Sequence, residues 1–338
     1  MRILTGIAVG WLVFVAAFLG LTGAHWWWRY VELAPPVVFL AVPVLMLLLA
    51  WRLRPGLARR GVVVTSLAAL ALGADLAGIF AGQAVPAKAD APASAVRVLS
   101  WNTEYWHHGA DPGEFYDWLL SQNADVYLLQ EYLGWDFERD LPRRFDDLAL
   151  LRRNFPGYHL AHAGELLTLS RYPIAAIVPL DGGSPVPGDT EYPEYYRYKV
   201  LRTDIDVRGS VFSAYNVHMP VQVALQASPA SARFWNFTRT QHERRLDSHR
   251  VLRADLAANP LPALVAGDFN ATAAMGELRS LGELLHQPRP RRLYSATWKG
   301  LWRLDWAFTT PRVLVHDYRM IDTRGFSDHR AQLLVLSP

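Results

Sequence analysis

Three long apolar runs in the first 85 residues constrain this chain more than any other feature of its sequence. They cover about residues 3–23, 35–51 and 61–82, and a helix needs roughly 20 mostly apolar residues to cross a bilayer. The first run exceeds the usual apolar core of a secretory signal peptide, and two further runs follow it. Residues 1–85 are therefore predicted to form a transmembrane region of three helices rather than the interior of a soluble domain.

The arginines of this region predict how its helices are oriented. Four of them lie between residues 52 and 60, in the short link between the second and third runs, and positively charged loops stay on the cytoplasmic side. The N-terminus is then cytoplasmic, and everything after the third run lies outside the cytoplasm. The aromatic residues between 26 and 30 fall in the outer loop, as expected for side chains at the headgroup level. The sequence thus predicts a multi-pass protein of the cell membrane whose larger part is extracytoplasmic.

Charge separates the two parts of the chain and bears on its partners. Residues 1–85 carry six arginines against Glu32 and Asp75, a net charge of +4, whereas the remaining 28 basic and 29 acidic residues give −1. A domain that grips nucleic-acid phosphates usually has a strongly basic face, so the near-neutral second part makes nucleic acid a less favoured partner. The chain has no cysteine, which excludes disulfides, thiolate catalysis and cysteine metal sites.

The second part of the chain alternates between strand and helix patterns. Residues 86–95, rich in alanine and proline, are predicted to be a linker to a single domain over 96–338. Helices are expected after Asp111-Pro112, an N-cap followed by proline at the first helical position, and over about Thr240–Ala258. Strands are expected at 96–101, 125–130, 166–170, 201–207, 210–216, 263–266, 304–309 and 331–336. Many short strands with few helices predict two packed sheets flanked by helices.

Polar residues stand at the ends of these predicted strands, where loops carry chemistry on a rigid frame. Taken singly, each has a structural explanation, because carboxylates and asparagines after strands are often turn or cap residues. Together they form an ordered set: Asn102, Glu131, His218, Asp268, Asn270, Asp305, Asp328 and His329.

This set resembles the endonuclease/exonuclease/phosphatase superfamily, which includes deoxyribonuclease I, abasic-site endonucleases, bacterial sphingomyelinases and inositol phosphate 5-phosphatases. The resemblance covers about residues 96–338. It rests on Leu99-Ser100-Trp101-Asn102, Leu129-Gln130-Glu131, Leu169-Ser170-Arg171-Tyr172-Pro173-Ile174, Asn216-Val217-His218, Gly267-Asp268-Phe269-Asn270, Leu304-Asp305-Trp306 and Ser327-Asp328-His329. The fold it implies is a deoxyribonuclease I-like four-layer α/β sandwich, with two mainly antiparallel sheets between helices.

The resemblance also implies a metal site. Glu131 would be the principal ligand of a divalent cation, with Asn102 beside it and Asp328 close, and Glu104 is a weaker candidate. Mg²⁺ is the expected ion, with Mn²⁺ or another divalent cation as the alternative, because Mg²⁺ favours hard oxygen ligands.

The remaining residues of the set have implied catalytic roles. Asp268 would orient or deprotonate the attacking water, and Asn270 would hold the phosphate. Asp305 would fix the tautomer and charge of His329, which would then stabilise the phosphoryl transition state. His218 would be the general acid for the leaving group, and its presence leans away from the abasic-site endonuclease branch.

These features predict a membrane-anchored, divalent-metal-dependent phosphohydrolase that acts outside the cytoplasm on a lipid or lipid-linked phosphate or pyrophosphate. The layout is similar to that of membrane phosphatases linked to teicoplanin resistance. The alternatives are an extracytoplasmic nuclease and a membrane-bound scaffold that has lost catalysis. The aromatic residues of segment 220–239 (Phe234, Trp235 and Phe237) are assigned equally to the core and to the membrane surface.

Overall fold

The computed structural model describes residues 2–78, 83–84, 91–107, 109–188, 190–224, 226–292 and 295–338. It divides into two compact units. The first unit contains Met1–Ala81 together with two later segments, Gln222–Arg239 and Ala271–Ser280, and the second contains the rest of the chain. Residues 86–90 of the predicted linker lie outside the described residues.

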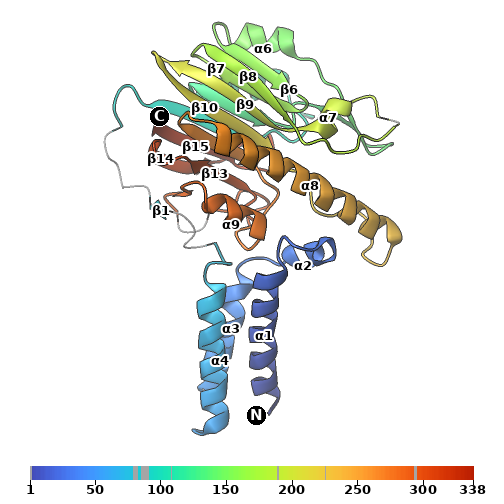
Figure 1. Cartoon of the computed structure of the whole chain (residues 1–338), viewed down its shortest axis with the longest axis vertical. Helices are drawn as coiled ribbons and strands as arrows, with labels where there is room; N and C mark the ends of the chain where they lie inside the picture. The colour runs from blue at the N-terminus through green and yellow to red at the C-terminus, as the bar shows by residue number, and fades with distance from the viewer. Residues whose placement is uncertain are drawn as a thin grey trace. The chain divides into compact units, whose positions relative to one another are not determined.

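The first unit is built on three apolar helices. They are α1 (Arg2–Leu21), α3 (Val38–Ala50) and α4 (Leu57–Gly73), and the loop after α1 holds two short turns, η1 (Trp26–Trp28) and α2 (Arg29–Glu32). Phe18 and Phe39 are fully buried where α1 meets α3. Figure 1 shows the N-terminus and the link between α3 and α4 at the same end of these helices.

The described helices are shorter than two of the three apolar runs. Helix α1, with 20 residues and a mean hydropathy of 2.3, is the one helix of the described chain that is long and apolar enough to cross a membrane. Helix α3 has 13 residues and begins only after Pro35-Pro36, and α4 has 17 residues and contains Arg59 and Arg60. The structure therefore supports one helix of spanning length, and the three-span arrangement stays a prediction.

The second unit contains two sheets, and their topology determines where strand ends meet (Figure 1). The five-stranded sheet has the order β13-β11-β10-β9-β8, and the six-stranded sheet has the order β14-β15-β2-β3-β7-β6. Most neighbours are antiparallel, but β2 runs parallel to β3 and β10 runs parallel to β11. The strands are β2 (Val96–Asn102), β3 (Val126–Gln130), β6 (His159–Ala163), β7 (Leu166–Ser170), β8 (Ile174–Asp181), β9 (Tyr198–Val207), β10 (Ser210–His218), β11 (Ala263–Asp268), β13 (Asp305–Thr309), β14 (Leu314–Ile321) and β15 (Ala331–Ser337).

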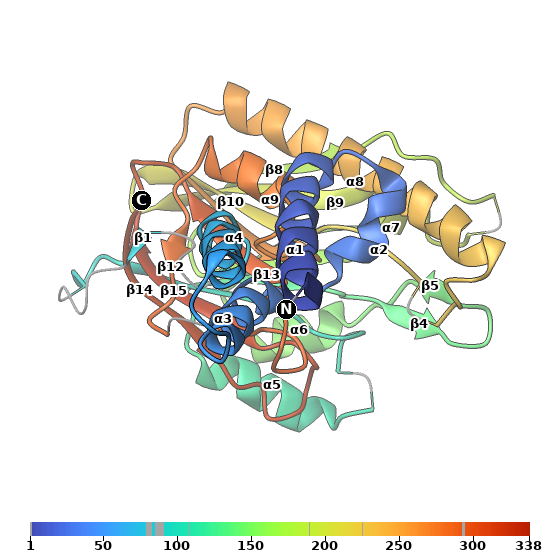
Figure 2. The same ribbon diagram turned by 90° about the horizontal axis from the view of Figure 1, so that it is seen from below.

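Helices cover the outer faces of the two sheets. Between the sheets, Val98 and Leu128 pack with Phe212 and Leu264 in a buried apolar layer. Strand residues alternate between faces, so Trp101 and its neighbours on the other face pack against α5 (Pro112–Ser121) and α6 (Leu148–Asn154). Figure 2 shows α8 (Ala232–Ala258) on the opposite side of the strands from α5 and α6. The predicted four-layer α/β sandwich is therefore the observed architecture.

Local sequence explains several element boundaries. Asp111 caps α5, because its Oδ1 accepts a hydrogen bond from the Glu114 amide at 3.0 Å and Pro112 opens the helix. Helix α8 begins at Ala232, eight residues before the predicted start at Thr240.

The smaller elements are β1 (Gln83–Ala84) paired with β12 (Pro288–Arg289), the hairpin β4 (Gly134–Asp136) and β5 (Leu141–Arg143), α7 (Pro193–Arg197) and α9 (Gly276–Gly282).

Candidate active site

One edge of the second unit gathers the strand ends that carry the polar set. The parallel strands β2 and β3 end at Asn102 and just before Glu131, and β10 and β11 end side by side at His218 and Asp268. The antiparallel neighbours begin at this same edge, because Asp305 of β13 pairs with Asp268. In the other sheet, β15 begins two residues after His329 and is antiparallel to β2.

Asp268 lies at the centre of this edge and is almost fully buried. Its Oδ2 is 3.8 Å from His218 Nε2 and 3.7 Å from His329 Nε2, and it accepts a hydrogen bond from Asn102 Nδ2 at 3.0 Å. Its Oδ1 accepts a hydrogen bond from the Asn270 amide at 2.7 Å. Burial raises the pKa of Asp268, and Asp305 adds to the effect, although the two histidines oppose it. A carboxylate with a raised pKa is a better proton acceptor.

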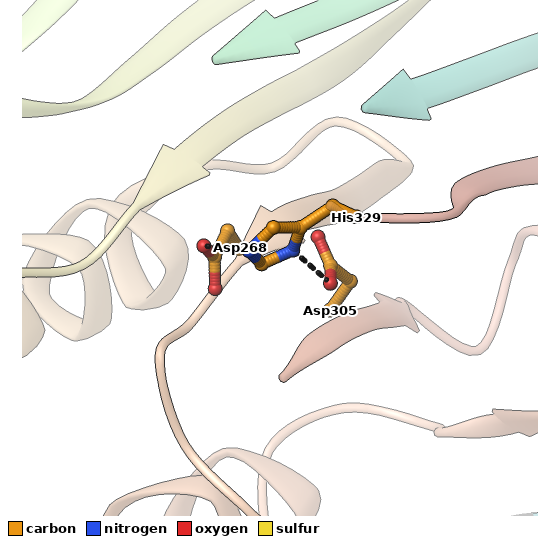
Figure 3. Close-up of side chains that lie close together, drawn as sticks. All are labelled: Asp268, Asp305 and His329. Carbon is orange, nitrogen blue, oxygen red and sulfur yellow. Dashed lines mark hydrogen bonds and ion pairs between the residues drawn. The ribbon is translucent and has the colours of Figure 1, made fainter. Parts of the chain in front are cut away.

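His329 forms a buried pair with Asp305 (Figure 3). Its Nδ1 lies 2.8 Å from Asp305 Oδ2, which leaves Nε2 facing Asp268. Burial alone would lower the pKa of His329, but the carboxylates of Asp305 and Asp268 outweigh burial and raise the pKa to about 10. His329 is therefore a cation at neutral pH, and a cation can stabilise negative charge on a phosphoryl group.

His218 has a carboxylate partner that the sequence did not reveal. Its Nδ1 is 3.0 Å from Oε2 of the fully buried Glu165, whose Oε1 forms a short ion pair with Lys199. Burial works against the charged imidazole, but Glu165, Asp268 and Glu131 together raise the pKa of His218. Both site histidines are thus orientated through Nδ1 and present Nε2 toward Asp268.

A second cluster at the same edge is rich in carboxylate oxygens. Glu131 Oε1 accepts a hydrogen bond from Asn102 Nδ2 at 3.0 Å, and Glu131 Oε2 accepts one from the Tyr105 amide at 3.1 Å. Glu104 Oε2 accepts a hydrogen bond from the Asp328 amide at 2.7 Å, which places the Glu104 carboxylate against the backbone of Asp328. Burial raises the pKa of Glu131, which indicates a carboxylate that a nearby cation would stabilise.

The carboxylates at this edge are of the kind that binds a divalent cation. Glu131, Asp328 and Glu104 supply the hard oxygens that Mg²⁺ prefers. The Asn102 amide group, as placed in the structure, donates to both Glu131 and Asp268, and its oxygen accepts a hydrogen bond from the Glu104 amide at 3.0 Å. Asn102 therefore contacts two carboxylates of the site, those of Glu131 and Asp268.

The backbone next to this cluster is strained. Four consecutive residues, Glu104–His107, have φ between 42° and 62°, and Glu131 has φ 60°. Left-handed backbone costs roughly 1–2 kcal/mol for each residue other than glycine. Such strain concentrates at functional sites, and here it turns the Tyr105 amide toward Glu131.

Asp268, Asp305 and His329 also satisfy the spacing of a metal site, because one ligand atom from each lies within 4.8 Å of the others. Their chemistry makes this position less suitable than the carboxylate cluster. Asp305 already binds Nδ1 of His329, and the raised pKa keeps that ring protonated, so it has no free lone pair for an ion. Glu131, Asp328 and Glu104 do not show this spacing among the described residues, so their role as metal ligands stays a prediction.

Asn270 and Arg245 connect the ends of β10 and β11. The Asn270 side chain donates to the Met219 carbonyl at 3.0 Å and lies 3.4 Å from His218 Nε2. Arg245 of α8 is fully buried, and its guanidinium donates to the Phe269 carbonyl at 2.9 Å and to the Pro220 carbonyl. These bonds hold the two chain segments that follow His218 and Asp268 in one arrangement.

The structure therefore brings the eight predicted residues together in one network of contacts. Asp328 joins it through His329 Nε2, 3.8 Å from Asp328 Oδ1, and through the Trp298 indole, which donates to Asp328 Oδ2 at 2.7 Å. Sequence reasoning missed Glu165, Lys199 and Trp298. The signal that could have identified Glu165 is the pairing of strands β3 and β7. Their antiparallel contact places Glu165 beside Tyr132, and the Tyr132 amide donates a hydrogen bond to the Glu165 carbonyl at 2.9 Å.

The chain is similar to several solved structures. No protein of curated function matches the chain significantly. Solved structures similar to it include an endonuclease/exonuclease/phosphatase from Bacteroides vulgatus, with 15% identity, a TM-score of 0.47, and coverage of 72% of this chain and 98% of that one. A mannosyl-6-phosphatase from Bacteroides thetaiotaomicron has 15% identity and a TM-score of 0.48 over 72% of this chain and 100% of its own. The human Nocturnin catalytic domain, with bound sulfate, has 16% identity and a TM-score of 0.47 over 72% and 94%.

The family comparison covers most of the chain. Residues 99–329 match the model of the Endonuclease/Exonuclease/phosphatase family, from the strand that ends at Asn102 to His329 itself. The chain therefore belongs to the endonuclease/exonuclease/phosphatase family.

Proposed function

We propose that this chain is a membrane-anchored, divalent-metal-dependent phosphohydrolase that acts outside the cytoplasm on a lipid or lipid-linked phosphate ester or pyrophosphate. The observation that carries the proposal is the position of Asp268, with the Nε2 atoms of His218 and His329 3.8 and 3.7 Å from its Oδ2. Phosphoryl transfer needs an activated in-line water, stabilisation of charge on the phosphoryl oxygens and help for the leaving group.

Asp268 is the group that orients the attacking water and takes its proton. Its Oδ1 is fixed by the Asn270 amide and its Oδ2 by Asn102 Nδ2, so the carboxylate is held in place before substrate binds. Burial raises its pKa toward the range of an effective general base. The carboxylate is thus held ready for the reaction, which lowers the cost of reorganisation in the transition state.

The histidines act on the substrate oxygens. Protonated His329, held through Nδ1 by Asp305, stabilises the negative charge of the phosphoryl group. His218, held through Nδ1 by Glu165, donates a proton from Nε2 to the leaving oxygen. The Asn270 side-chain amide lies beside His218 and would hold a phosphate oxygen.

Glu131 and Asp328, with Glu104, would hold the divalent cation, and Asn102 would orient Glu131. When bound, the cation would neutralise charge on the phosphate and polarise its oxygens. The chain's own contribution is to keep these carboxylates oriented, through the Tyr105 amide on Glu131 and the Trp298 indole on Asp328.

Exposed apolar side chains on the three N-terminal helices support a membrane location. Ile3 and Val13 of α1 are 78% and 62% exposed, Leu48 of α3 is 64% exposed and Val64 of α4 is 65% exposed. A soluble protein rarely leaves so many large apolar groups in water on neighbouring helices. Together with the apolar length of α1, this supports a bundle in which α1, α3 and α4 all contact lipid.

A membrane location and a near-neutral catalytic domain favour a lipid phosphate over nucleic acid. Residues 86–338 have a net charge of −1, whereas tight binding to nucleic acid depends on a cationic field. An anchored enzyme also meets lipid substrates at a high effective concentration without additional contacts. We therefore expect at least roughly tenfold greater kcat/KM for a membrane-embedded phosphate or pyrophosphate ester than for duplex DNA.

The test compares the two substrate classes at equal ester concentration, using the full chain in detergent micelles. Lipid phosphates, lipid pyrophosphates, sphingomyelin and duplex DNA are each assayed with Mg²⁺, after treatment with EDTA, and after Mg²⁺ is restored. We expect phosphate release from a lipid substrate that EDTA abolishes and Mg²⁺ recovers. Equal rates in EDTA would contradict the metal requirement. Robust cleavage of duplex DNA without release from any lipid would make the extracytoplasmic nuclease the better assignment.

A topology measurement tests the membrane arrangement separately. The four arginines of the link between α3 and α4 predict that this link is cytoplasmic. A reporter that is active only outside the cytoplasm should be active when fused to the C-terminus and inactive when fused near Arg54. The reverse pattern would overturn the orientation and the choice of extracytoplasmic substrates.

A further inference from the structure

Two later segments of the chain fold as part of the N-terminal unit. They are Gln222–Arg239 and Ala271–Ser280, and both pack with residues of the first 81. Each follows closely on a strand that carries site residues. Gln222 comes four residues after His218, and Ala271 is bonded directly to Asn270.

The segment Ala271–Ser280 is fitted closely against the end of α1. Ala274 is fully buried in an apolar cluster with Val15, Phe18 and other residues of the N-terminal helices. Thr22 Oγ1 donates to the Ala274 carbonyl at 3.3 Å and accepts a hydrogen bond from the Gly276 amide at 3.0 Å. A Cβ atom on Gly276 would lie 2.7 Å from the Thr22 carbonyl oxygen, so only glycine fits here without displacing backbone.

A buried ion network joins the same two parts of the chain. The Arg29 guanidinium is fully buried and lies 2.9 Å from Glu32 Oε2 and 2.8 Å from Glu277 Oε2. Glu32 Oε1 in turn accepts a hydrogen bond from the Gly23 amide at 2.7 Å. Breaking a buried ion network by removing one member leaves an uncompensated charge, so these contacts specify one arrangement of the segment.

The second segment is attached to the same loop by aromatic contacts. The Phe234 ring is 5.6 Å from the Tyr30 ring, and the Trp235 ring is 6.1 Å from the Trp26 ring. Phe234 is almost fully buried, which places it in the core of the unit. Gln222 Nε2 contacts Met275 Sδ at 2.6 Å and so links the two segments to each other.

We propose that the N-terminal region positions the active-site residue Asn270, by holding the segment that follows it against Thr22 and Arg29. Thr22, Arg29 and Gly276 are then positioning residues, and the N-terminal region is part of the catalytic apparatus rather than a detachable anchor. Asn270 has a left-handed backbone with φ 47°, and its side chain reaches Met219 and His218 from that conformation. A displacement of about 1 Å at a reacting group can reduce the rate by roughly 10²-fold.

The inference rests on the proposed role of Asn270, and a pair of glycine variants of α9 tests it. Gly276→Ala forces the segment away from Thr22, whereas Gly282→Ala, at the other end of the same helix, adds a Cβ with nothing within 4 Å. In the full chain in detergent micelles, G276A should increase amide hydrogen exchange across residues 271–280, and G282A should not. G276A should also lower kcat by at least about tenfold, while G282A retains the wild-type value.

A double-mutant cycle distinguishes positioning from general damage. If Gly276 acts through Asn270, adding G276A to Asn270→Ala causes no further loss of kcat. If the kcat losses of the two single variants multiply in the double variant, the positioning role is wrong. If amide hydrogen exchange across residues 271–280 is unchanged in G276A, Gly276 does not hold the segment against Thr22. If G276A does not fold, Arg29→Gln replaces it in the same cycle. Should the wild type hydrolyse no phosphate ester, the proposed function fails, but the exchange comparison still decides whether Thr22 and Arg29 hold the segment.

Discussion

Asp268→Asn is expected to lower kcat by on the order of 10³-fold, the size of a lost general base. The amide keeps the shape of the side chain, and its oxygen can still accept the hydrogen bond from the Asn270 amide, but it cannot take a proton from water. Because burial raises the pKa of Asp268, the folded state disfavours its charge. Losing that charge should therefore not lower the thermal unfolding midpoint.

The measurement is steady-state hydrolysis at saturating Mg²⁺, with thermal unfolding followed in parallel. Asp117→Asn is the matched control, since it removes a carboxylate from the exposed face of α5. It should retain wild-type kcat and KM. An unchanged kcat in Asp268→Asn would remove Asp268 from the mechanism, and a large rise in KM alone would assign it to substrate binding.

The sequence predicts the interior strands of this fold better than its edges. Strands β2, β3, β10, β11 and β15 are central and mostly buried, so they appear as short apolar runs. Strands β6, β8 and β14 were not predicted. All three lie at sheet edges and mix buried with exposed positions, as in β8, whose residues alternate between half-buried and exposed. An edge strand has a hydrogen-bonded neighbour on one side only, and the mixed burial of these three strands leaves no continuous apolar run to identify them.

The site was predictable to the extent that its residues follow strands directly. Asn102, Glu131, His218 and Asp268 end or follow strands that run in one direction, and this places them at one edge. Glu165 lies in none of the motifs that carry the family resemblance, and the antiparallel pairing of β7 with β3 brings it to the same edge. Lys199, near the start of β9, likewise reaches the site through Glu165.

The N-terminal region illustrates a different limit. Apolar runs predict where helices occur, but their ends depend on local chemistry, such as the Pro35-Pro36 step before α3. The docking of segments 222–239 and 271–280 could not be predicted from patterns. It depends on single contacts between distant residues, such as the Arg29 and Glu277 ion pair. The aromatic pair Phe234 and Trp235, equally suited by sequence to a core or a membrane surface, packs with Tyr30 and Trp26.

Replacing His329 is the second change with a large expected effect. His329→Ala removes the cation that faces Asp268 and the phosphoryl group, and the loss of one such group costs roughly 10²–10³-fold in kcat. His316→Ala is a suitable control, because His316 is buried but contacts Ser337 at the far end of β15. It should leave kcat unchanged.

The paired carboxylate makes this role measurable as a pH dependence. In the wild type, Asp305 and Asp268 raise the pKa of His329 to about 10, so the imidazole stays protonated through neutral and mildly alkaline pH. In Asp305→Asn the largest charge that opposes burial is lost, and burial then lowers the pKa. In this variant the His329 imidazole therefore loses its proton at a lower pH than in the wild type.

The expected result is therefore an alkaline decline of kcat that begins at lower pH in Asp305→Asn than in the wild type, with closer agreement between the two at acidic pH. Profiles are measured from about pH 6 to about pH 10 at saturating Mg²⁺, with Asp117→Asn as the charge control. In His329→Ala, the alkaline decline of kcat that results from deprotonation of this histidine should disappear. Coincident alkaline limbs in the wild type and Asp305→Asn would show that the charge of His329 does not limit the reaction. Asp305 would then act by orienting the ring alone, and the stabilising charge would have to come from another group, of which His218 is the nearest to Asp268.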